Sequence, residues 1–166
     1  MRFYGERHLV QVDDRLFIGD IRAATSSELH KRHDFRLVVN CTTSVPFLEP
    51  KVIPSVTYLR VGVEDNGRPE EIKKLGEHIP ATVDAIDRHL SEGHNVLVHC
   101  RMGRQRSAAI IAAYLMYKYP DFTHDKAIAY VKYKKGDTFF PAANFYSALQ
   151  EYAAVLLKSN TVQKTI

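Results

Sequence analysis

Hydrophobic positions in the first sixty residues come in short runs, which is typical of strands. Apolar side chains dominate Leu9–Val12 and Leu16–Gly19 on either side of a turn-like pair of aspartates, and this pattern predicts a β-hairpin. A serine or threonine within residues 25–27 can cap a helix that ends near residue 33. The apolar runs Leu37–Asn40 and Val56–Val61 predict two further, buried strands.

The period of the hydrophobic pattern changes at Pro69. Apolar residues then recur every three or four positions as far as Leu90, which is one stripe of an amphipathic helix. Pro69 suits the first turn of this helix and Gly93 the residue just past its end. Pro80 falls inside the stripe, so we expect a kink there or two abutting helices. A short central strand is then predicted over Asn95–His99.

Helical patterns dominate the second half of the chain. Residues Ser107–Lys118 are apolar nearly all round, which predicts a buried helix. Thr123 can cap the next helix, and a last amphipathic helix is predicted over Phe145–Leu156. Strands interspersed with helices favour an α/β domain with a central mixed sheet of about five strands flanked by helices. We expect this domain over residues 1–158, followed by a short, polar and frayed tail over residues 159–166.

Length and composition narrow the class of protein. The chain has 166 residues, of which 45% are hydrophobic, and this suits one compact domain. The sequence shows neither a signal-peptide pattern nor an apolar stretch of membrane-spanning length. We therefore expect a cytoplasmic protein, with access to the nucleus open and without stable membrane insertion. The net charge of +4 favours anionic partners, and the oligomeric state stays open.

Patterns typical of metal sites and disulfide frameworks are missing from the sequence. There are two cysteines, Cys41 and Cys100, and eight histidines, without CxxC or HExxH spacing. His30 and His33 stand three apart on one predicted helix, without a third ligand nearby in the sequence. We expect them to lie on a solvated helix face, and we expect neither a metal nor a cofactor.

One segment places reactive side chains in a loop between a strand and a helix. Cys100 follows the strand, Arg106 comes after five intervening residues, and the buried helix starts at about Ser107. Backbone N–H groups of such a loop, together with the helix N-terminus, favour a bound anion. Gly103 supplies a positive φ or a close backbone approach. The residues predicted to bind the substrate phosphate are Arg101, Met102, Gly103, Arg104, Gln105 and Arg106.

Three side chains of this segment are candidates for the chemistry. A helix N-terminus and nearby arginines stabilise a thiolate, so Cys100 can attack the phosphorus of a phosphomonoester. The planar fork of Arg106 can hold two phosphoryl oxygens, and these contacts strengthen as charge spreads over the equatorial oxygens. The hydroxyl of Ser107 can donate a hydrogen bond to the sulfur and ease its departure when the phosphocysteine is hydrolysed.

The motif His-Cys-x-x-Gly-x-x-Arg-Ser over residues 99–107 resembles the signature of the protein tyrosine phosphatase superfamily. The small size and the surrounding segments are similar to the dual-specificity branch, and the resemblance runs from about Leu9 to Leu156. It implies the cysteine-phosphatase fold in a protein that consists of the catalytic domain. It also implies hydrolysis of phosphotyrosine and phosphoserine or phosphothreonine on proteins through a phosphocysteine intermediate.

The reaction needs a general acid, because the leaving oxygen must be protonated and water must later be activated. The resemblance places this acid on a loop before the cysteine, and Asp65 precedes Cys100 by 35 residues. Asn66 and Gly67 give this stretch a turn-like, mobile character. Glu64 is the rival for the role, and Asp65 could instead cap the helix that follows.

The resemblance also implies supporting roles outside the loop. His99 packs behind the loop rather than acting as a base, Asn40 braces the loop, and Asn144 borders the pocket. Cys41 resembles the backdoor cysteine of some lipid and dual-specificity phosphatases. One hypothesis is that peroxide oxidises Cys100 and that Cys41 resolves the sulfenic acid as a disulfide; the alternative is an ordinary buried cysteine.

The loop departs from the commonest dual-specificity pattern. Gln105 stands where serine is usual, and Arg101 and Arg104 make the rim cationic. Phosphoprotein substrates are the first expectation, and a phosphoinositide, phospholipid or RNA 5′-phosphatase with the same cysteine mechanism is the alternative. A non-catalytic phosphate-binding module would lack the nucleophile, the arginine or the acid, and the sequence has a candidate for each.

Overall fold

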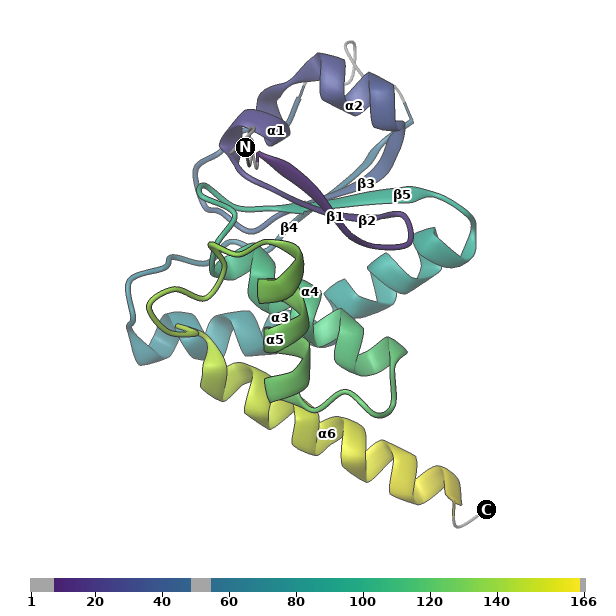
Figure 1. Ribbon diagram of the computed structural model, residues 1–166, viewed down its shortest axis with the longest axis vertical. Coiled ribbons are helices and arrows are strands. Elements are labelled where there is room, and N and C mark those ends of the chain that lie inside the picture. The colour runs from purple at the N-terminus through teal and green to yellow at the C-terminus, as the bar shows by residue number, and fades with distance from the viewer. Residues whose placement is uncertain (1–7, 49–54, 165–166) are drawn as a thin grey trace, which may run out of the picture.

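The computed structural model describes residues 8–48 and 55–164 and contains a five-stranded sheet in the order β1-β2-β5-β3-β4 (Figure 1). β1 pairs antiparallel with β2, and the other neighbours in the sheet are parallel. The strands are β1 (Leu9–Asp13), β2 (Leu16–Gly19), β3 (Phe35–Asn40), β4 (Thr57–Arg60) and β5 (Asn95–His99). The predicted mixed sheet of about five strands is confirmed.

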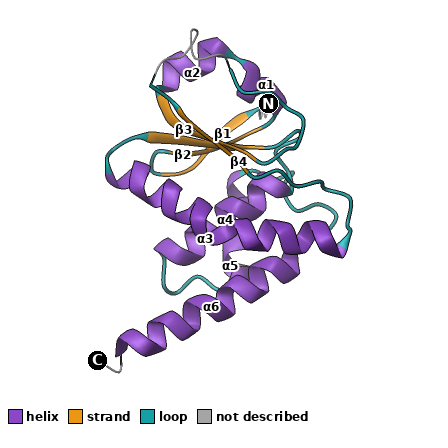
Figure 2. Cartoon of the chain, turned by 180° about the vertical axis from the view of Figure 1, so that it is seen from behind, coloured by secondary structure: helices purple, strands orange, loops and turns teal. Residues whose placement is uncertain are grey.

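Helices cover both faces of this sheet. They are α1 (Ile21–Thr25), α2 (Ser27–His33), α3 (Pro69–Ser91), α4 (Arg106–Lys118), α5 (His124–Lys134) and α6 (Tyr146–Lys164). Figures 1 and 2 show α1 and α2 on one face of the sheet and the other four helices on the opposite face. The flanking helices expected for an α/β domain are therefore present.

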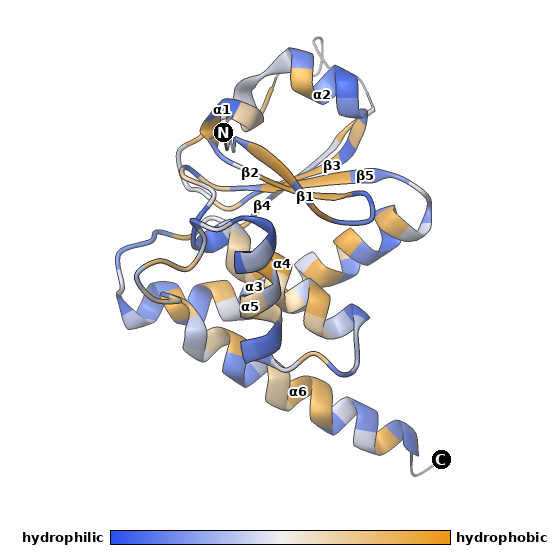
Figure 3. Cartoon of the chain, in the orientation of Figure 1, coloured by the Kyte–Doolittle hydropathy of each residue, from blue (hydrophilic) through white to orange (hydrophobic). Residues whose placement is uncertain are grey.

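The central strand β5 contributes to the core on both faces. Val96 and Val98 belong to the large cluster between the sheet and α3–α6, whereas Leu97 packs with Phe17 and Phe35 beneath α1 and α2. Figure 3 accordingly shows β5 hydrophobic over much of its length. Strands buried on both faces are typical of parallel sheets covered by helices.

The helix caps predicted from the sequence are present, and α3 passes through Pro80 without a break. Ser26 accepts a hydrogen bond from the N–H of Leu29, and Thr123 accepts one from the N–H of Lys126. Pro80 lies inside α3, which continues as one helix from Pro69 to Ser91, so the alternative of two abutting helices is wrong. A proline inside a helix costs about 3 kcal/mol, and the long buried face of α3 offsets this cost.

The chain continues in a helix beyond the expected start of the tail. α6 extends to Lys164, although residues 158–164 are all exposed. Elongating an existing helix needs no new nucleus, so a polar continuation can stay helical without packing. The expectation of a frayed tail is therefore wrong over residues 159–164, and the domain limit at residue 158 stays a prediction.

His30 also differs from the expectation of a solvated helix face. It is buried, its Nε2 lies 3.2 Å from the carbonyl oxygen of Ala23, and its ring packs edge-on against Phe35. His33 stacks on the same phenyl ring. The two histidines therefore pack α2 onto the sheet.

Candidate active site

Three segments meet at a cleft of about 220 Å³ beside the end of β5. The signature loop (residues 100–105) connects β5 to α4, the acid loop (residues 61–68) connects β4 to α3, and the clamp segment (residues 139–145) lies between α5 and α6. The residues that line the cleft are Asp65, Cys100, Met102, Arg104, Gln105, Arg106, Phe140 and Asn144. Arg101 and Gly103, which were predicted to bind substrate, are not among them.

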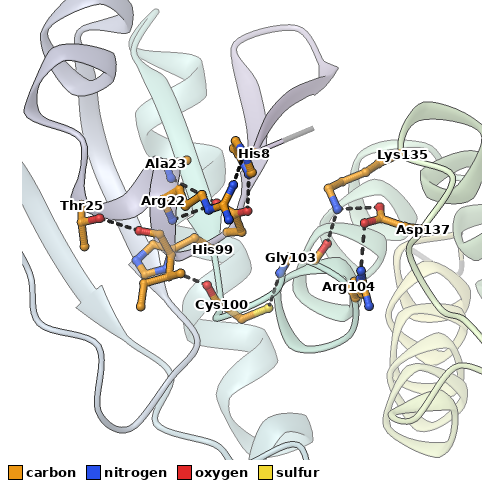
Figure 4. Close-up of polar contacts among 12 residues, drawn as sticks. His8, Arg22, Ala23, Thr25, His99, Cys100, Gly103, Arg104, Lys135 and Asp137 are labelled. Carbon is orange, nitrogen blue, oxygen red and sulfur yellow. Dashed lines mark hydrogen bonds and ion pairs between the residues drawn. The ribbon is translucent and has the colours of Figure 1, made fainter. Parts of the chain in front are cut away.

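The sulfur of Cys100 is buried and faces hydrogen-bond donors. Sγ lies 3.1 Å from the hydroxyl oxygen of Ser107. The N–H of Gly103 donates to Sγ over 3.2 Å, as Figure 4 shows. Donors of this kind stabilise a thiolate relative to a thiol. The arrangement suits a nucleophile at the floor of the cleft.

Gly103 allows the signature loop to curl around that sulfur. Its φ is +67°, and a Cβ at this position would lie 3.0 Å from the carbonyl oxygen of Gly19. The neighbouring carbonyl of Arg101 accepts a hydrogen bond from the N–H of Ile21 over 2.9 Å. The loop therefore packs closely against the backbone that leads into α1, and only glycine fits at residue 103 without strain.

Arg106 stands at the first position of α4 and reaches across to the acid loop. Its Nη1 donates to the carbonyl oxygen of Val63 over 2.9 Å. Its Nε is buried and has no hydrogen-bond partner within the described ranges. A buried N–H without an acceptor is costly, and an oxyanion in the cleft would supply the missing acceptor.

A buried lysine supports the signature loop from below. Lys135, 1% exposed, follows α5, and its Nζ donates to the carbonyl oxygen of Gly103 over 2.9 Å. The same ammonium group contacts Asp137 at 2.6 Å, and Asp137 also pairs with Nε of Arg104 at 3.4 Å (Figure 4). Neither Lys135 nor Asp137 could be predicted from the sequence, because a lysine in a basic, polar stretch gives no sign of burial.

The acid loop places Asp65, not Glu64, on the cleft. Asp65 is exposed, and its Oδ1 accepts a hydrogen bond from Nδ2 of Asn144 over 2.9 Å. The carboxylate of Glu64 instead accepts from the hydroxyl of Thr43. Asp65 does not cap α3 either, since Arg68 occupies the N-cap position without a side-chain cap. The geometry therefore favours Asp65 over both alternatives.

The side chain of Gln105 is engaged with protein rather than open to substrate. Nε2 donates to the carbonyl oxygens of Ala142 over 2.9 Å and of Phe140 over 3.4 Å. Oε1 accepts from the N–H of Asn144 over 3.0 Å. Three of the four possible hydrogen bonds of this side chain go to the clamp segment. Phosphate binding by Gln105 stays a prediction that concerns its backbone N–H.

The supporting residues behind the loop only partly follow the expectation. Burial lowers the pKa of His99 to about 4, and its Nδ1 donates to the carbonyl oxygen of Cys100 over 3.4 Å. The ring is therefore neutral near pH 7. The side chain of Asn40 bonds Val45 and Thr42 and does not reach the signature loop, so its expected direct bracing role is wrong.

Cys41 lies close to the site but does not line the cleft. Its N–H donates to the carbonyl oxygen of His99 over 2.8 Å, and its side chain is fully buried. Burial raises the pKa of the Cys41 thiol well above its usual range, and the neighbouring Cys100 adds to this shift. The disulfide with Cys100 stays a prediction, which mass spectrometry of the peroxide-treated protein tests.

Two negative findings hold for residues 8–48 and 55–164. No group of three or more His, Cys, Asp or Glu side chains is placed to hold a metal ion in this part of the chain. Over the same ranges, none of the helices combines the length and the apolar character needed to span a bilayer.

Comparison with known proteins gives consistent matches over most of the chain. The family model described as dual specificity phosphatase, catalytic domain, matches residues 16–155. Mouse dual specificity phosphatase 28 is 36% identical over 146 residues, which cover 88% of this chain and 84% of that protein. The crystal structure of the human protein of that name superposes with a TM-score of 0.77 at 33% identity, covering 90% of this chain and 95% of that one. A mouse putative dual specificity phosphatase, solved in complex with zinc tungstate, has a TM-score of 0.80 at 31% identity and covers 96% and 95%.

Proposed function

The chain belongs to the dual specificity phosphatase family, and we propose that Cys100, Arg106 and Asp65 carry out its reaction. The protein is a dual-specificity protein phosphatase, which removes phosphate from phosphotyrosine and from phosphoserine or phosphothreonine on proteins. The single observation that carries the residue assignment is the convergence of these three side chains on one cleft.

In the first step, the thiolate of Cys100 attacks the phosphorus opposite the leaving oxygen. The S–P bond forms while the bond between phosphorus and the leaving oxygen breaks, and Asp65 gives its proton to that oxygen. The backbone of the signature loop and the guanidinium of Arg106 bind the three equatorial oxygens. These contacts are strongest in the transition state, where the charge on those oxygens is spread.

In the second step, water attacks the phosphocysteine. The carboxylate of Asp65 takes a proton from this water, the P–O bond forms, and the S–P bond breaks to release inorganic phosphate. The electron pair returns to the sulfur of Cys100. The hydroxyl of Ser107 and the N–H of Gly103, both about 3 Å from that sulfur, stabilise the returning thiolate.

An oxyanion ligand in a related structure supports this use of the cleft. The mouse neighbour at 31% identity was crystallised with zinc tungstate, and tungstate is a tetrahedral oxyanion like phosphate. The buried Nε of Arg106, which lacks a partner within the described chain, is a donor that such an anion can satisfy. We expect tungstate to inhibit this protein competitively with a phosphopeptide substrate.

Substitution of the two cysteines tests the assignment of the nucleophile. We expect Cys100→Ser to abolish turnover and the burst of product release, because an alcohol at this position forms no phosphoenzyme at a useful rate. Cys41→Ala is the matched control, since Cys41 is buried outside the cleft, and we expect it to keep the burst. A burst in Cys100→Ser would overturn the assignment.

Lipid and RNA phosphates remain the alternative class of substrate, and the rim of the cleft bears on it. Of the two rim arginines, Arg101 does not line the cleft and Arg104 pairs with Asp137. The positive charge available to a polyanion is therefore smaller than the sequence indicates, which favours phosphoproteins. A panel of phosphopeptides, phosphoinositides and triphosphorylated RNA at equal concentration distinguishes the classes through kcat/KM.

A further inference from the structure

The clamp segment (residues 139–145) lies between the signature loop and the acid loop and bonds to both. Gln105 holds it from the side of the signature loop, and Asn144 extends from it to Asp65. We propose that Gln105 and Asn144 are positioning residues that hold the general acid Asp65 at the cleft. The proposal rests on the role proposed for Asp65 and assigns no catalytic role to either amide.

Gln105 ties the clamp segment to the signature loop at three points. Its amide nitrogen contacts the carbonyl oxygens of Phe140 and Ala142, and its amide oxygen accepts the N–H of Asn144. Gln105 is 6% exposed, and its three bonds are partly shielded from water, which helps to fix the segment in one place. Because Gln105 directly precedes Arg106, these bonds fix the position of the clamp segment relative to the phosphate-binding arginine.

Asn144 connects the clamp segment to the general acid Asp65. Nδ2 of Asn144 donates to Oδ1 of Asp65 over 2.9 Å, and this is the single hydrogen bond of the Asp65 carboxylate within the described residues. The other carboxylate oxygen, Oδ2, is thereby left for the proton that is transferred. Without Asn144, an exposed aspartate on a loop samples several side-chain rotamers.

Residues 64–68 of the acid loop are exposed. Gly67 has a φ of +74°, and a Cβ there would meet no atom within 4 Å. The loop is tied at Val63, whose carbonyl oxygen accepts from Arg106, and at Glu64, which bonds Thr43 and Glu71. The side chain of Asp65 is tied through Asn144. The contact at Val63 comes from Arg106, and Asn144, which bonds Asp65, is itself held by Gln105. Adjacent residues of the signature motif therefore contact the acid loop directly and through Asn144.

A positioning role for the acid has a distinctive kinetic signature. p-Nitrophenolate leaves readily without a proton, whereas the alkoxide of serine does not, so loss of acid catalysis grows with the basicity of the leaving group. A general loosening of the fold would lower both activities by the same factor. The comparison of two substrates therefore separates positioning from stability.

The experiment measures kcat/KM of Asn144→Ala and Gln105→Ala with p-nitrophenyl phosphate and with a phosphoserine peptide. For Asn144→Ala we expect a loss of about tenfold with the peptide and of less than about twofold with p-nitrophenyl phosphate. Gln105→Ala should show the same pattern in the same direction. Asn144 is exposed, so its replacement leaves the fold intact, and this variant decides the test if Gln105→Ala proves unstable.

A double-mutant cycle with Asp65→Asn completes the test. Once the acid is absent, Asn144→Ala should cause no further loss with the phosphoserine peptide. Asn95→Ala is the matched control, because Asn95 donates a similar amide hydrogen bond, over 2.6 Å to the carbonyl oxygen of His33, at the opposite end of β5. We expect this control to affect both substrates equally.

The outcomes separate this proposal from the function on which it rests. Equal losses on both substrates for Asn144→Ala, or an undiminished loss in the Asp65→Asn background, would overturn the positioning role. If Asp65→Asn itself lowers both activities equally, the assignment of Asp65 as the acid is wrong. In that case the failure lies with the proposed function rather than with the amide contacts.

Discussion

The signature loop and the acid loop border the same cleft but are held in place very differently. The signature loop is bonded from several sides, by the N–H of Ile21, by Lys135 and by its own glycine around the sulfur. Residues 64–68 of the acid loop are exposed, and the carboxylate of Asp65 is held by Asn144. The loop proposed to bind the phosphate is therefore part of the folded core, while the loop proposed to transfer the proton lies at the surface.

This difference suits the two tasks. A phosphate cradle works best when its donors are fixed before the charge develops, because no reorganisation is then needed in the transition state. A general acid that later acts as a base must serve a leaving group and then a water molecule at the same face, and an exposed loop permits this adjustment. Perturbing each side should accordingly have different consequences.

The largest effect is expected for Arg106→Lys, which keeps the charge but removes the planar fork. We expect kcat/KM with p-nitrophenyl phosphate to fall by about 10²- to 10³-fold, because phosphoryl oxygens lose a bidentate donor. The tie to Val63 is lost as well. Arg36→Lys, at a partly exposed position of β3 paired with Asp34, is the control. A loss below tenfold would mean that the fork of Arg106 is dispensable.

Low pH should destabilise the folded protein through the buried side chain of His99. Its folded pKa is about 4, below the usual 6.5, because burial disfavours the charged ring. The unfolded chain therefore binds more protons between these values, and the free energy of unfolding falls as pH drops from 6.5 to 4, by about 3 kcal/mol in total. Above pH 6.5, the contribution of His99 to the free energy of unfolding no longer depends on pH.

Urea unfolding at several pH values measures this effect, with His99→Gln as the comparison. That variant should show a smaller slope of stability against pH over the same interval, even if it is less stable overall. The buried His30, whose pKa burial also lowers, contributes in the same direction and leaves a residual slope. An unchanged slope in His99→Gln would contradict the prediction.

Removal of the buried ammonium group should test how the signature loop is supported. Lys135→Met keeps the length of the side chain but leaves the carbonyl of Gly103 without its donor, and we expect a loss of about 1–3 kcal/mol in stability. The kinetic effect should be the same for good and poor leaving groups, unlike that of Asn144→Ala. Lys132→Met, at an exposed position of α5, should change neither quantity. A loss confined to poor leaving groups would place Lys135 with the acid instead.

The smallest effect concerns the apolar rim. Met102 and Phe140 line the cleft and are 54% and 74% exposed, so they can contact the ring of a phosphotyrosine but hardly the shorter phosphoserine. We expect Phe140→Ala to raise KM about threefold for a phosphotyrosine peptide and to leave KM for the phosphoserine peptide unchanged. Equal shifts for both peptides would show that the rim does not select aryl groups.

The sequence predicted those parts of the molecule that depend on neighbouring residues. The hydrophobic periods gave the strands, most helix limits and the burial of α4, and one contiguous motif contains Cys100, Arg106 and Ser107. The family resemblance is confirmed by the matches to dual specificity phosphatases. The choice of Asp65 rested on that resemblance and on spacing along the chain.

The remaining features depend on residues far apart in the chain. Asn144 and Asp65 are separated by 79 residues, and Lys135 and Gly103 by 32, so no local pattern can reveal either contact. The contacts of Gln105 were missed for the same reason, since a loop glutamine can face a ligand or a neighbouring segment. His30 was misplaced because a histidine carries no sign of whether aromatic rings will cover it.

The burial of α4 has a consequence for the timescale on which the site moves. Residues 107–116 of this helix are all buried, so their amide hydrogens should exchange with deuterium only when the whole domain unfolds. Arg106, at the start of the same helix, then stays in place for as long as the protein is folded. The amides of residues 64–68 should exchange orders of magnitude faster. A compound that binds the rigid cradle would meet one target conformation, whereas one that binds the acid loop would have to select among many.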